Sequence, residues 1–258
     1  TYFEDDNFTF HGTGKEMFIG FIKAIGIFIG LAALVGIFVY LGMGLIGGLL
    51  FYLGIFAILP LAIHGSYRYR MSRTSWRGIR FGYRGERNVL FTKFIKGLVL
   101  TIITLGIYGA WFAIDIRNYV LSHIRFGDMK FKYQASGTDF FVLNLKGYFL
   151  TIFTLGIYMF WWQKDLFEFY VNHLSIQKDE EEIRFHSFAT GGDFFGLIFV
   201  NILIVIFTLG LGFPWVVTRT LKFITGKIDI LGNIDTSNIQ QTEEAYFDAT
   251  GEDVADFL

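Results

Sequence analysis

The sequence predicts an α-helical integral membrane protein of tandem helix-hairpin repeats, with short β-strands forming a sheet at the cytoplasmic face. Its 258 residues are 53% hydrophobic and 17% charged, with a mean hydropathy of +0.48, whereas soluble domains carry about 25% charged residues. An apolar run from Met17 to Leu41 is long enough to cross a hydrocarbon core ~30 Å thick. The stretch Thr101–Tyr108, Thr-Ile-Ile-Thr-Leu-Gly-Ile-Tyr, recurs at Thr151–Tyr158 with one substitution, which indicates internal repetition.

The first part of the chain contains the two longest apolar runs. Alternating residues at Phe8–His11 predict a short strand before the first of them. Lys23 interrupts that run near one end, where its amine can reach the lipid headgroups. Gly42-Met-Gly44 predicts a turn, and Leu45–Ile63 predicts the second span.

A strongly basic segment, His64 to Asn88, follows the second span and contains a single acid, Glu86. Basic residues beside membrane spans tend to stay in the cytoplasm, so we place this segment and the N-terminus there. The chain is then a multi-pass protein with a cytoplasmic N-terminus. The basic residues are candidate contacts for anionic lipid or for a protein partner: Arg68, Arg70, Arg73, Arg77, Arg80, Arg84 and Arg87.

Matching motifs divide the chain into four repeated segments. Each begins with an aromatic strand, continues as an apolar helix, turns at a glycine and returns through a second helix to another strand. Phe207–Trp215 is a weaker copy of the glycine turn. We number the segments 1 to 4; they span about 8–76, 79–126, 129–176 and 183–231. They form a membrane domain of residues 1–232, which an acidic tail, 233–258, follows.

Short turns are predicted where one segment meets the next. Arg77-Gly78 and Gly127-Asp128 each stand between alternating runs, which is typical of a two-residue β-hairpin. Asp179–Glu182 predicts a solvated hairpin tip. Asp139 and Asp193 occupy matching places near helix starts, where an acid is favoured by the helix dipole.

The helices of the middle segments are short for a membrane. Val89–Thr104 and Asp139–Thr154 would each be about 24 Å long. The second helix of each pair carries charges in its first ten residues, and charges in hydrocarbon are costly without partners or water. Either these helices are shielded within a bundle, or they are amphipathic and lie in the interface. We favour hairpins that begin and end on the same side, because the strand motifs repeat so closely.

The charges in the second helices are candidate functional residues, because ionisable side chains at membrane depth often move ions or protons. They also fit a structural role as interhelical salt bridges or headgroup contacts. The candidate intramembrane charges are Asp115, Arg117, Lys164, Asp165, Glu168 and Arg219.

The repeated motifs resemble those of a known family. The Thr-Leu-Gly-Ile-Tyr-x-x-Trp box, the Tyr-x-x-x-His ending and Trp76-Arg-Gly-x-Arg-Phe81 are together similar to the YjgN-like family of bacterial inner-membrane proteins of unknown function. The resemblance implies an inner-membrane location and supplies no activity or catalytic residues. Members usually have Pro-Trp after the tyrosine; Pro214-Trp215 keeps this pair, whereas Ala110-Trp111 and Phe160-Trp161 depart from it.

Several functions are disfavoured by the residues available. The chain has no cysteine, so it has no thiolate nucleophile or Cys-based metal site, and its net charge of −1 gives no basis for nucleic-acid binding. His123 and His173 occupy matching positions, but a metal site needs further ligands. No hydrolase or nucleotide-binding motif occurs. We therefore expect no catalytic residues, metal or cofactor.

The most economical functional hypothesis is a non-enzymatic accessory or scaffold subunit of a membrane complex. It would bind a protein partner or membrane lipids through its strand-bearing face. The alternative is a transporter or channel for a small solute or ion, since internal repeats are common in transporters. A lipid-modifying enzyme ranks last. Within the tail, Val254–Leu258 is a candidate to dock on the basic segment.

Overall fold

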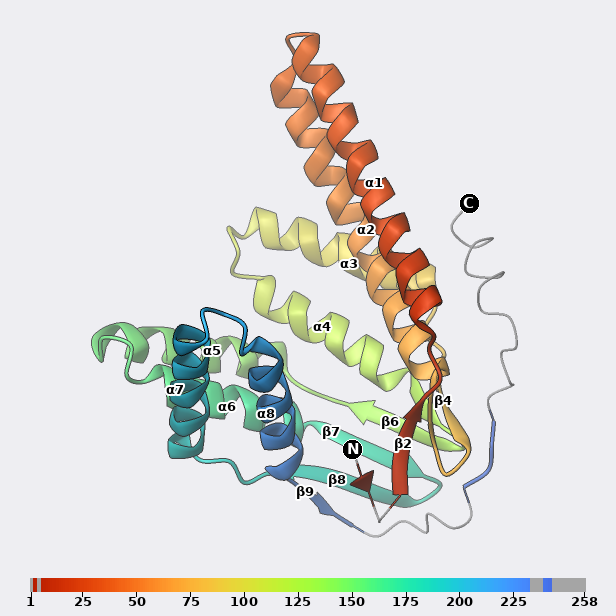
Figure 1. Ribbon diagram of the computed structural model, residues 1–258, viewed down its shortest axis with the longest axis vertical. Helices are drawn as coiled ribbons and strands as arrows, with labels where there is room; N and C mark the ends of the chain where they lie inside the picture. The colour runs from red at the N-terminus through yellow and green to blue at the C-terminus, as the bar shows by residue number, and fades with distance from the viewer. Residues whose placement is uncertain (1, 4–5, 233–238, 243–258) are drawn as a thin grey trace. The chain divides into compact units, whose positions relative to one another are not determined.

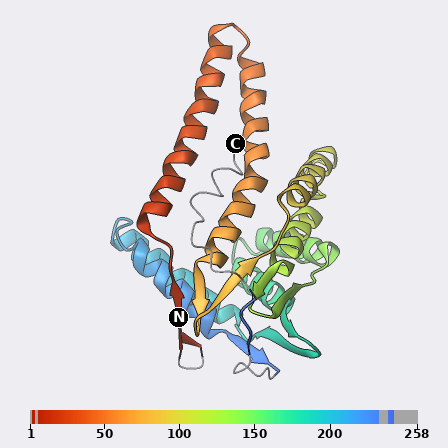
Figure 2. The ribbon, with the colours of Figure 1, turned by 90° about the vertical axis from the view of Figure 1, so that its right-hand side faces the viewer.

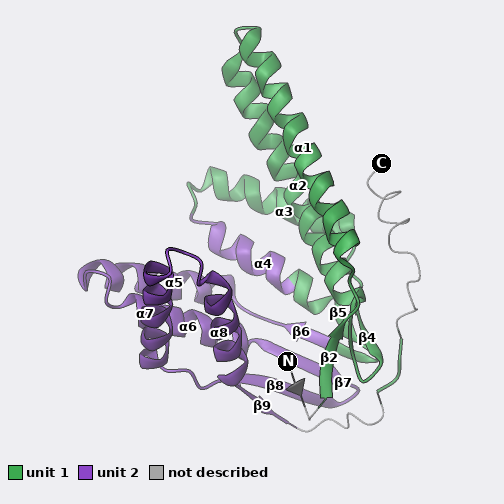
Figure 3. Ribbon diagram, in the orientation of Figure 1, with its two compact units in different colours: residues 1–106, 119–130, 236–258 green, residues 107–118, 131–235 purple. Residues whose placement is uncertain are grey.

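The computed structural model describes residues 2–3, 6–232 and 239–242 (Figure 1). The chain divides into two compact units, coloured separately in Figure 3. Compact unit 1 holds residues 1–106, 119–130 and 236–258, and compact unit 2 holds residues 107–118 and 131–235. Each unit combines helix hairpins with antiparallel strands, so the predicted combination of helices and a sheet is confirmed.

Compact unit 1 begins with strands and a long helix hairpin. Its elements, in chain order, are β1 (Tyr2–Phe3), β2 (Asp6–Phe10), α1 (Gly14–Tyr40), α2 (Gly44–Ser72), β3 (Thr74–Trp76), β4 (Ile79–Tyr83), α3 (Arg87–Ile103), the end of α4 (Gly109–Ser122), β5 (Ile124–Phe126) and the start of β6 (Met129–Tyr133).

Compact unit 2 contains two complete short hairpins. Its elements are the start of α4, the end of β6, α5 (Gly137–Phe153), α6 (Met159–Asn172), β7 (Leu174–Lys178), β8 (Glu181–Ser187), α7 (Gly191–Phe207), α8 (Phe213–Gly226) and β9 (Ile228–Leu231).

Helices α1 and α2 run antiparallel from the shared turn near Gly42 (Figure 2). A capping box begins α1: the Thr13 hydroxyl accepts from the Glu16 amide at 3.2 Å, and the Glu16 carboxylate accepts from the Thr13 amide at 3.1 Å. Both helices are long and apolar enough to cross a membrane. Among the described residues of α1 none is buried.

The basic segment His64–Asn88 forms regular structure, including the strand hairpin predicted at Arg77-Gly78. It continues α2 to Ser72 and then forms β3 and β4. Aromatic packing stabilises this order: Tyr69 meets Phe10 edge-on at 6.2 Å between ring centroids, and Trp76 stacks on Phe8 at the same distance. A high density of arginine therefore did not prevent regular structure, because the intervening aromatic residues are held against β2.

The strands are hydrogen-bonded in chain order, β1 to β9, with antiparallel pairing between the neighbours for which the register is known. The predicted two-residue turns are confirmed at Arg77-Gly78 and Gly127-Asp128. The acidic run also forms a hairpin tip, between Lys178 and Glu181. Arg77 and Gly78 both have positive φ, which matches the right-handed twist of the strands they join.

One backbone hydrogen bond recurs in every segment, where the strand leading into the hairpin passes the end of the second helix. It holds the beginning and end of each helix hairpin side by side at the sheet. The four bonds, from amide to carbonyl, are His11 to Arg73 at 2.7 Å, Arg84 to His123 at 2.9 Å, Gln134 to His173 at 3.2 Å and Phe188 to Lys227 at 3.2 Å.

The hydrophobic core of each compact unit lies at the sheet end of its hairpins. In compact unit 1, Leu90 and Phe94 are buried on the first turns of α3. In compact unit 2, Phe194 and Leu197 are buried on the first turns of α7. The far end of each hairpin contributes little to these cores, which leaves its turn exposed.

Residues 239–242 lie against compact unit 1. The Thr242 hydroxyl donates to the Gly127 carbonyl, and the Arg80 amide donates to the Gln241 side-chain oxygen at 3.1 Å. The predicted docking of Val254–Leu258 falls outside the described residues.

Candidate functional site

The three short hairpins, α3–α4, α5–α6 and α7–α8, end in the same backbone turn. Leu105, Leu155 and Leu209 each have a φ of 51°, in the left-handed region. The glycine that follows each leucine also has positive φ, and its amide bonds back to the carbonyl five residues earlier, which closes the helix. These bonds are Gly106 to Thr101 at 2.7 Å, Gly156 to Thr151 at 2.7 Å and Gly210 to Val205 at 2.8 Å.

Threonine side chains complete the turns. Thr154 donates to the Leu150 carbonyl at 2.7 Å and accepts from the Tyr158 amide at 2.9 Å. Thr208 makes the equivalent contacts in the last hairpin, to the Ile204 carbonyl and from the Gly212 amide. The Thr154 and Thr208 hydroxyls and the amides they accept from are therefore satisfied within their turns, while the exposed side chains around them are apolar.

The leucines at the turns are almost fully exposed. Leu105 is 94%, Leu155 95% and Leu209 93% exposed. A left-handed conformation costs a residue other than glycine about 1–2 kcal/mol, and no packing against the described part of the chain offsets it. Neighbouring side chains enlarge each apolar tip: Ile103, Ile107, Phe153, Ile157, Phe207 and Leu211 are also exposed.

The predicted intramembrane charges lie on α4, α6 and α8. Lys164 pairs with Asp165 at 3.3 Å and with Glu168, all on α6. The hydrogen bond that Lys164 donates to the Glu168 carboxylate raises the pKa of Lys164. Asp115 is exposed on α4, and Arg219 is half-buried on α8.

Arg117 lies against two aromatic rings that the sequence did not single out. Its guanidinium carbon is 4.1 Å from the Tyr170 ring centroid and 5.3 Å from that of Tyr133. Burial raises the pKa of Tyr133 to about 12, so this side chain stays neutral. The sequence feature that could have indicated this contact is the aromatic residue at the end of the strand before each helix hairpin, such as Tyr133 at the end of β6.

The seven candidate arginines are distributed over the end of α2, the β3–β4 turn, strand β4 and the start of α3. Arg73 is buried, and its guanidinium contacts Glu16 at 2.7 Å, so it holds α2 to α1. Arg77 is exposed; it pairs with Asp6 and lies 4.4 Å from the Trp76 ring centroid. Arg68, Arg70, Arg80, Arg84 and Arg87 lie at intermediate or exposed positions.

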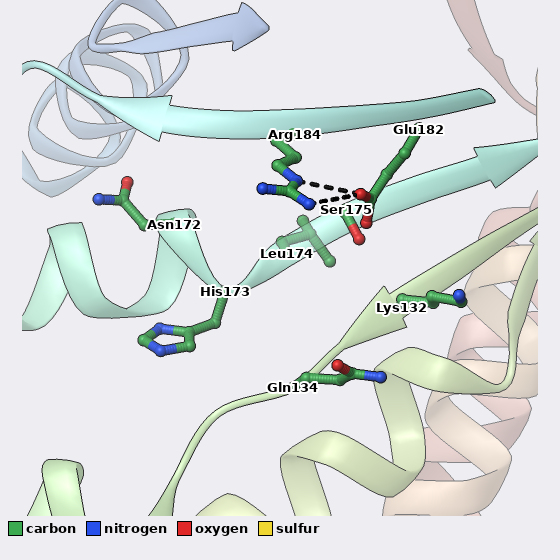
Figure 4. Close-up of a pocket in the computed structure, with 8 residues that line it drawn as sticks. All are labelled: Lys132, Gln134, Asn172, His173, Leu174, Ser175, Glu182 and Arg184. Carbon is green, nitrogen blue, oxygen red and sulfur yellow. Dashed lines mark hydrogen bonds and ion pairs between the residues drawn. The ribbon is translucent and has the colours of Figure 1, made fainter. Parts of the chain in front are cut away.

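A polar cavity of about 230 Å³ lies in compact unit 2 (Figure 4). The carboxylate of Glu182 accepts two hydrogen bonds from Arg184, at 3.0 and 2.8 Å, and so neutralises the nearest guanidinium. Lys132 on β6 and Gln134, directly after that strand, also line the cavity. The remaining lining residues are Asn172, His173, Leu174 and Ser175.

His123 and His173 occupy the same position at the ends of α4 and α6. In each, Nδ1 donates to the carbonyl four residues earlier, at 2.6 Å to Tyr119 and at 2.7 Å to Phe169. Both side chains therefore close a helix. Over the described part of the chain, no three His, Asp or Glu side chains are grouped so that they could hold a metal ion.

Comparison with known proteins gives a family and no activity. No curated protein and no solved structure matches the chain. A family model described as "Bacterial protein of unknown function (DUF898)" matches residues 1–148 and 162–257. The match covers nearly the whole chain, including the glycine turns at Gly106 and Gly210, and it confirms the predicted resemblance. The chain therefore belongs to this bacterial family of unknown function, the YjgN-like family.

Proposed function

We propose that this protein is a non-enzymatic membrane scaffold of the bacterial inner membrane. In this proposal α1 and α2 cross the bilayer, and the three short hairpins insert their apolar turns into it without crossing. The sheet remains at the cytoplasmic surface, where it binds lipid headgroups or a protein partner. The observation that carries the proposal is the threefold occurrence of an exposed leucine in a strained turn.

Lipid is the environment that accounts for these turns. Burying an exposed leucine is favourable by about 1.5–3 kcal/mol, which offsets the cost of the left-handed backbone. Contiguous apolar surfaces of this kind on a soluble protein promote aggregation. Insertion into lipid is less costly because the Thr154 hydroxyl and the Gly106, Gly156 and Gly210 amides are already hydrogen-bonded within the turns.

Helix length separates the spanning hairpin from the inserted ones. Helix α3 has 17 residues and α4 has 14, which corresponds to about 26 and 21 Å. Both are shorter than a hydrocarbon core of ~30 Å. Helices α1 and α2 have 27 and 29 residues. The most apolar window of α1 is 0% buried, unlike the core helix of a soluble protein.

The accessory role rests on how the charges are arranged. Several of the charges considered for transport have local partners, since Lys164 pairs with Glu168 and Arg117 lies on Tyr170. The exposed arginines near the end of α2 and in β3–β4 suit anionic headgroups, at roughly 1 kcal/mol per residue. These charges therefore support binding to lipid or to a protein partner better than transport.

The absence of cysteine allows a direct test. Cysteine is introduced singly at Ile107, Ile157 or Leu211, and each variant is labelled with an environment-sensitive fluorophore in lipid nanodiscs. We expect a blue-shifted emission that lipid-attached quenchers reduce. Glu180→Cys, at the exposed β7–β8 tip, is the control and should report water. A water-like emission at all three turns would rule out insertion.

A further inference from the structure

Tryptophan-on-glycine contacts join segment 2 to segment 3 and segment 3 to segment 4. Gly137 begins α5, and a Cβ added to it would lie 2.5 Å from the Trp111 ring and 2.8 Å from the Trp111 Cα. Gly191 begins α7, and its added Cβ would lie 2.6 Å from the Trp161 ring. Only glycine permits these approaches. In both cases a tryptophan near the start of a segment's second helix lies against the first residue of the first helix in the following segment.

A second aromatic contact accompanies each junction. Phe141, four residues after Gly137, stacks on Trp111 with 5.1 Å between ring centroids. Phe195, four residues after Gly191, meets Phe160 edge-on at 5.0 Å. The receiving surface is thus a glycine at the helix start with a phenylalanine one turn later, and we name it the acceptor.

Segment 1 has the same acceptor sequence and the same local geometry. Thr13-Gly14-Lys-Glu16 and Phe18 align with Ser136-Gly137-Thr-Asp139 and Phe141. The Thr13 hydroxyl accepts from the Glu16 amide at 3.2 Å, and the Ser136 hydroxyl accepts from the Asp139 amide at 3.3 Å. Both helices therefore begin in the same way, with the glycine at the same place.

The acceptor of segment 1 is open. No atom of the described residues lies within 4 Å of a Cβ added at Gly14, and Phe18 is 61% exposed. The tryptophan of segment 4 that corresponds to Trp111 and Trp161 is exposed. Trp215 is 68% exposed, and Phe213 beside it is 61% exposed. We name this surface the donor.

We propose that the donor of one copy docks on the acceptor of a second copy, with Trp215 on Gly14 and Phe18. The contact repeats the chemistry of the internal junctions and joins copies head to tail. Because the two surfaces differ, the interface is heterologous, and copies assemble into closed rings or open chains. Lipid alone does not account for Gly14, since glycine weakens a helix by about 1 kcal/mol relative to alanine and lipid contact needs no such gap.

Disulfide cross-linking between two tagged copies tests the contact. Trp215→Cys with one tag and Gly14→Cys with another are co-expressed, and the membranes are oxidised. We expect a mixed dimer that contains both tags, and no larger species, because each copy carries a single cysteine. Trp111→Cys/Gly137→Cys within one chain is the matched positive control, since those two positions are already in contact.

A collision control and a chain-length control complete the experiment. Lys130→Cys, also exposed and on the same side of the membrane as Gly14 in this proposal, replaces Gly14→Cys and should give at least tenfold less mixed dimer. The double variant Trp215→Cys/Gly14→Cys should give a ladder of oligomers. If the internal control closes but the mixed dimer is absent or no stronger than the collision control, the proposal is wrong. A double variant that oxidises without any gain in mass also overturns it.

A second measurement does not rely on cysteine. Gly14→Leu blocks the acceptor without a clash inside the chain, and Gly20→Leu is an equally unhindered change on the same helix. By mass photometry in detergent, we expect Gly14→Leu to shift the protein to monomer and Gly20→Leu to leave the oligomer intact. Equal masses for the two variants would contradict the proposal.

Discussion

At the residue scale, the effect of a helical glycine on packing depends on whether another side chain lies against it. A Cβ added at Gly147 would lie 2.3 Å from the Trp162 ring, and Gly147 is buried in the middle of α5. Gly196, on α7, has nothing within 4 Å of an added Cβ among the described residues. The two positions share a residue type and a helical conformation, and they differ only in what lies beside them.

We expect Gly147→Ala to destabilise the protein by about 1–3 kcal/mol, because the methyl group forces the indole or the helix to move. Gly196→Ala should be neutral or stabilising by up to about 1 kcal/mol, since alanine is the better helix former. Thermal unfolding in detergent, followed by intrinsic fluorescence, measures both. Equal melting temperatures for the two variants would contradict the packing shown for Trp162.

Also at the residue scale, Asp193 makes the stability of the folded protein depend on pH. Its carboxylate accepts from the Thr190 amide and hydroxyl, each at 2.8 Å, and pairs with Lys227 at 3.0 Å. Hydrogen bonds from the Thr190 backbone and hydroxyl, followed by Lys227, lower the pKa of Asp193 from 3.8 to about 2. The folded pKa lies below the unfolded one, so the stabilisation is present above about pH 4 and is lost as pH falls toward 2.

We therefore expect Asp193→Asn to lower the melting temperature at pH 6, by an amount corresponding to about 1 kcal/mol. The difference from the parent protein should shrink between pH 4 and pH 2, because the parent carboxylate is protonated there. Melting curves of both proteins across this range measure the effect. A difference that stays constant down to pH 2 would show that the ionised form is not what stabilises α7.

At the scale of an element, the backbone of the leucine turn serves folding and its side chain serves membrane binding. Its backbone needs a residue that tolerates positive φ, and its side chain serves only the surroundings. Asparagine tolerates the left-handed conformation better than leucine does. A Leu→Asn change therefore keeps the turn and removes the apolar tip.

We expect the triple variant L105N/L155N/L209N to fold with unchanged helix content and to bind lipid less strongly. The readout is quenching of tryptophan fluorescence by brominated lipids, which should fall at least twofold because Trp111, Trp161 and Trp215 follow the turns. L231N, at an exposed leucine on β9, is the control and should leave quenching unchanged. Equal quenching in the triple variant would mean that the turns lie outside the bilayer.

At the scale of the whole molecule, the prediction concerns which side of the membrane the α1–α2 turn and the strands face. If α1 and α2 cross the inner membrane with the arginine-bearing strands inside, the α1–α2 turn faces the periplasm. Met43 lies at that turn, and Lys130 lies on β6; both belong to compact unit 1 and are exposed. Each can be replaced by cysteine in a chain that has no other thiol.

We expect an impermeant maleimide added to intact cells to label Met43→Cys and to leave Lys130→Cys unlabelled until the cells are opened. The physical reason is that the bilayer separates the two positions and excludes the reagent. Labelling of Lys130→Cys in sealed cells would place the strands outside and would remove the basis for a cytoplasmic binding face.

Local chemistry made much of the fold predictable. The apolar runs gave the two long helices to within a few residues at their starts, and the Thr-Leu-Gly boxes located all three short turns. Two-residue hairpins at Arg77-Gly78 and Gly127-Asp128 followed from turn residues alone. In each case the residues that decide the structure are neighbours in the chain, so a short window of sequence contains the cause.

The sequence by itself therefore determined the repeated order of strands, helices and glycine turns, and membership of the family. Only the tertiary structure decided that Arg73 is buried on Glu16, that α2 continues to Ser72, and that Trp111 rests on Gly137. The reason is distance along the chain: these contacts join residues from different elements. A residue type alone does not say whether an arginine meets water or a carboxylate, or whether a glycine meets open space or an indole.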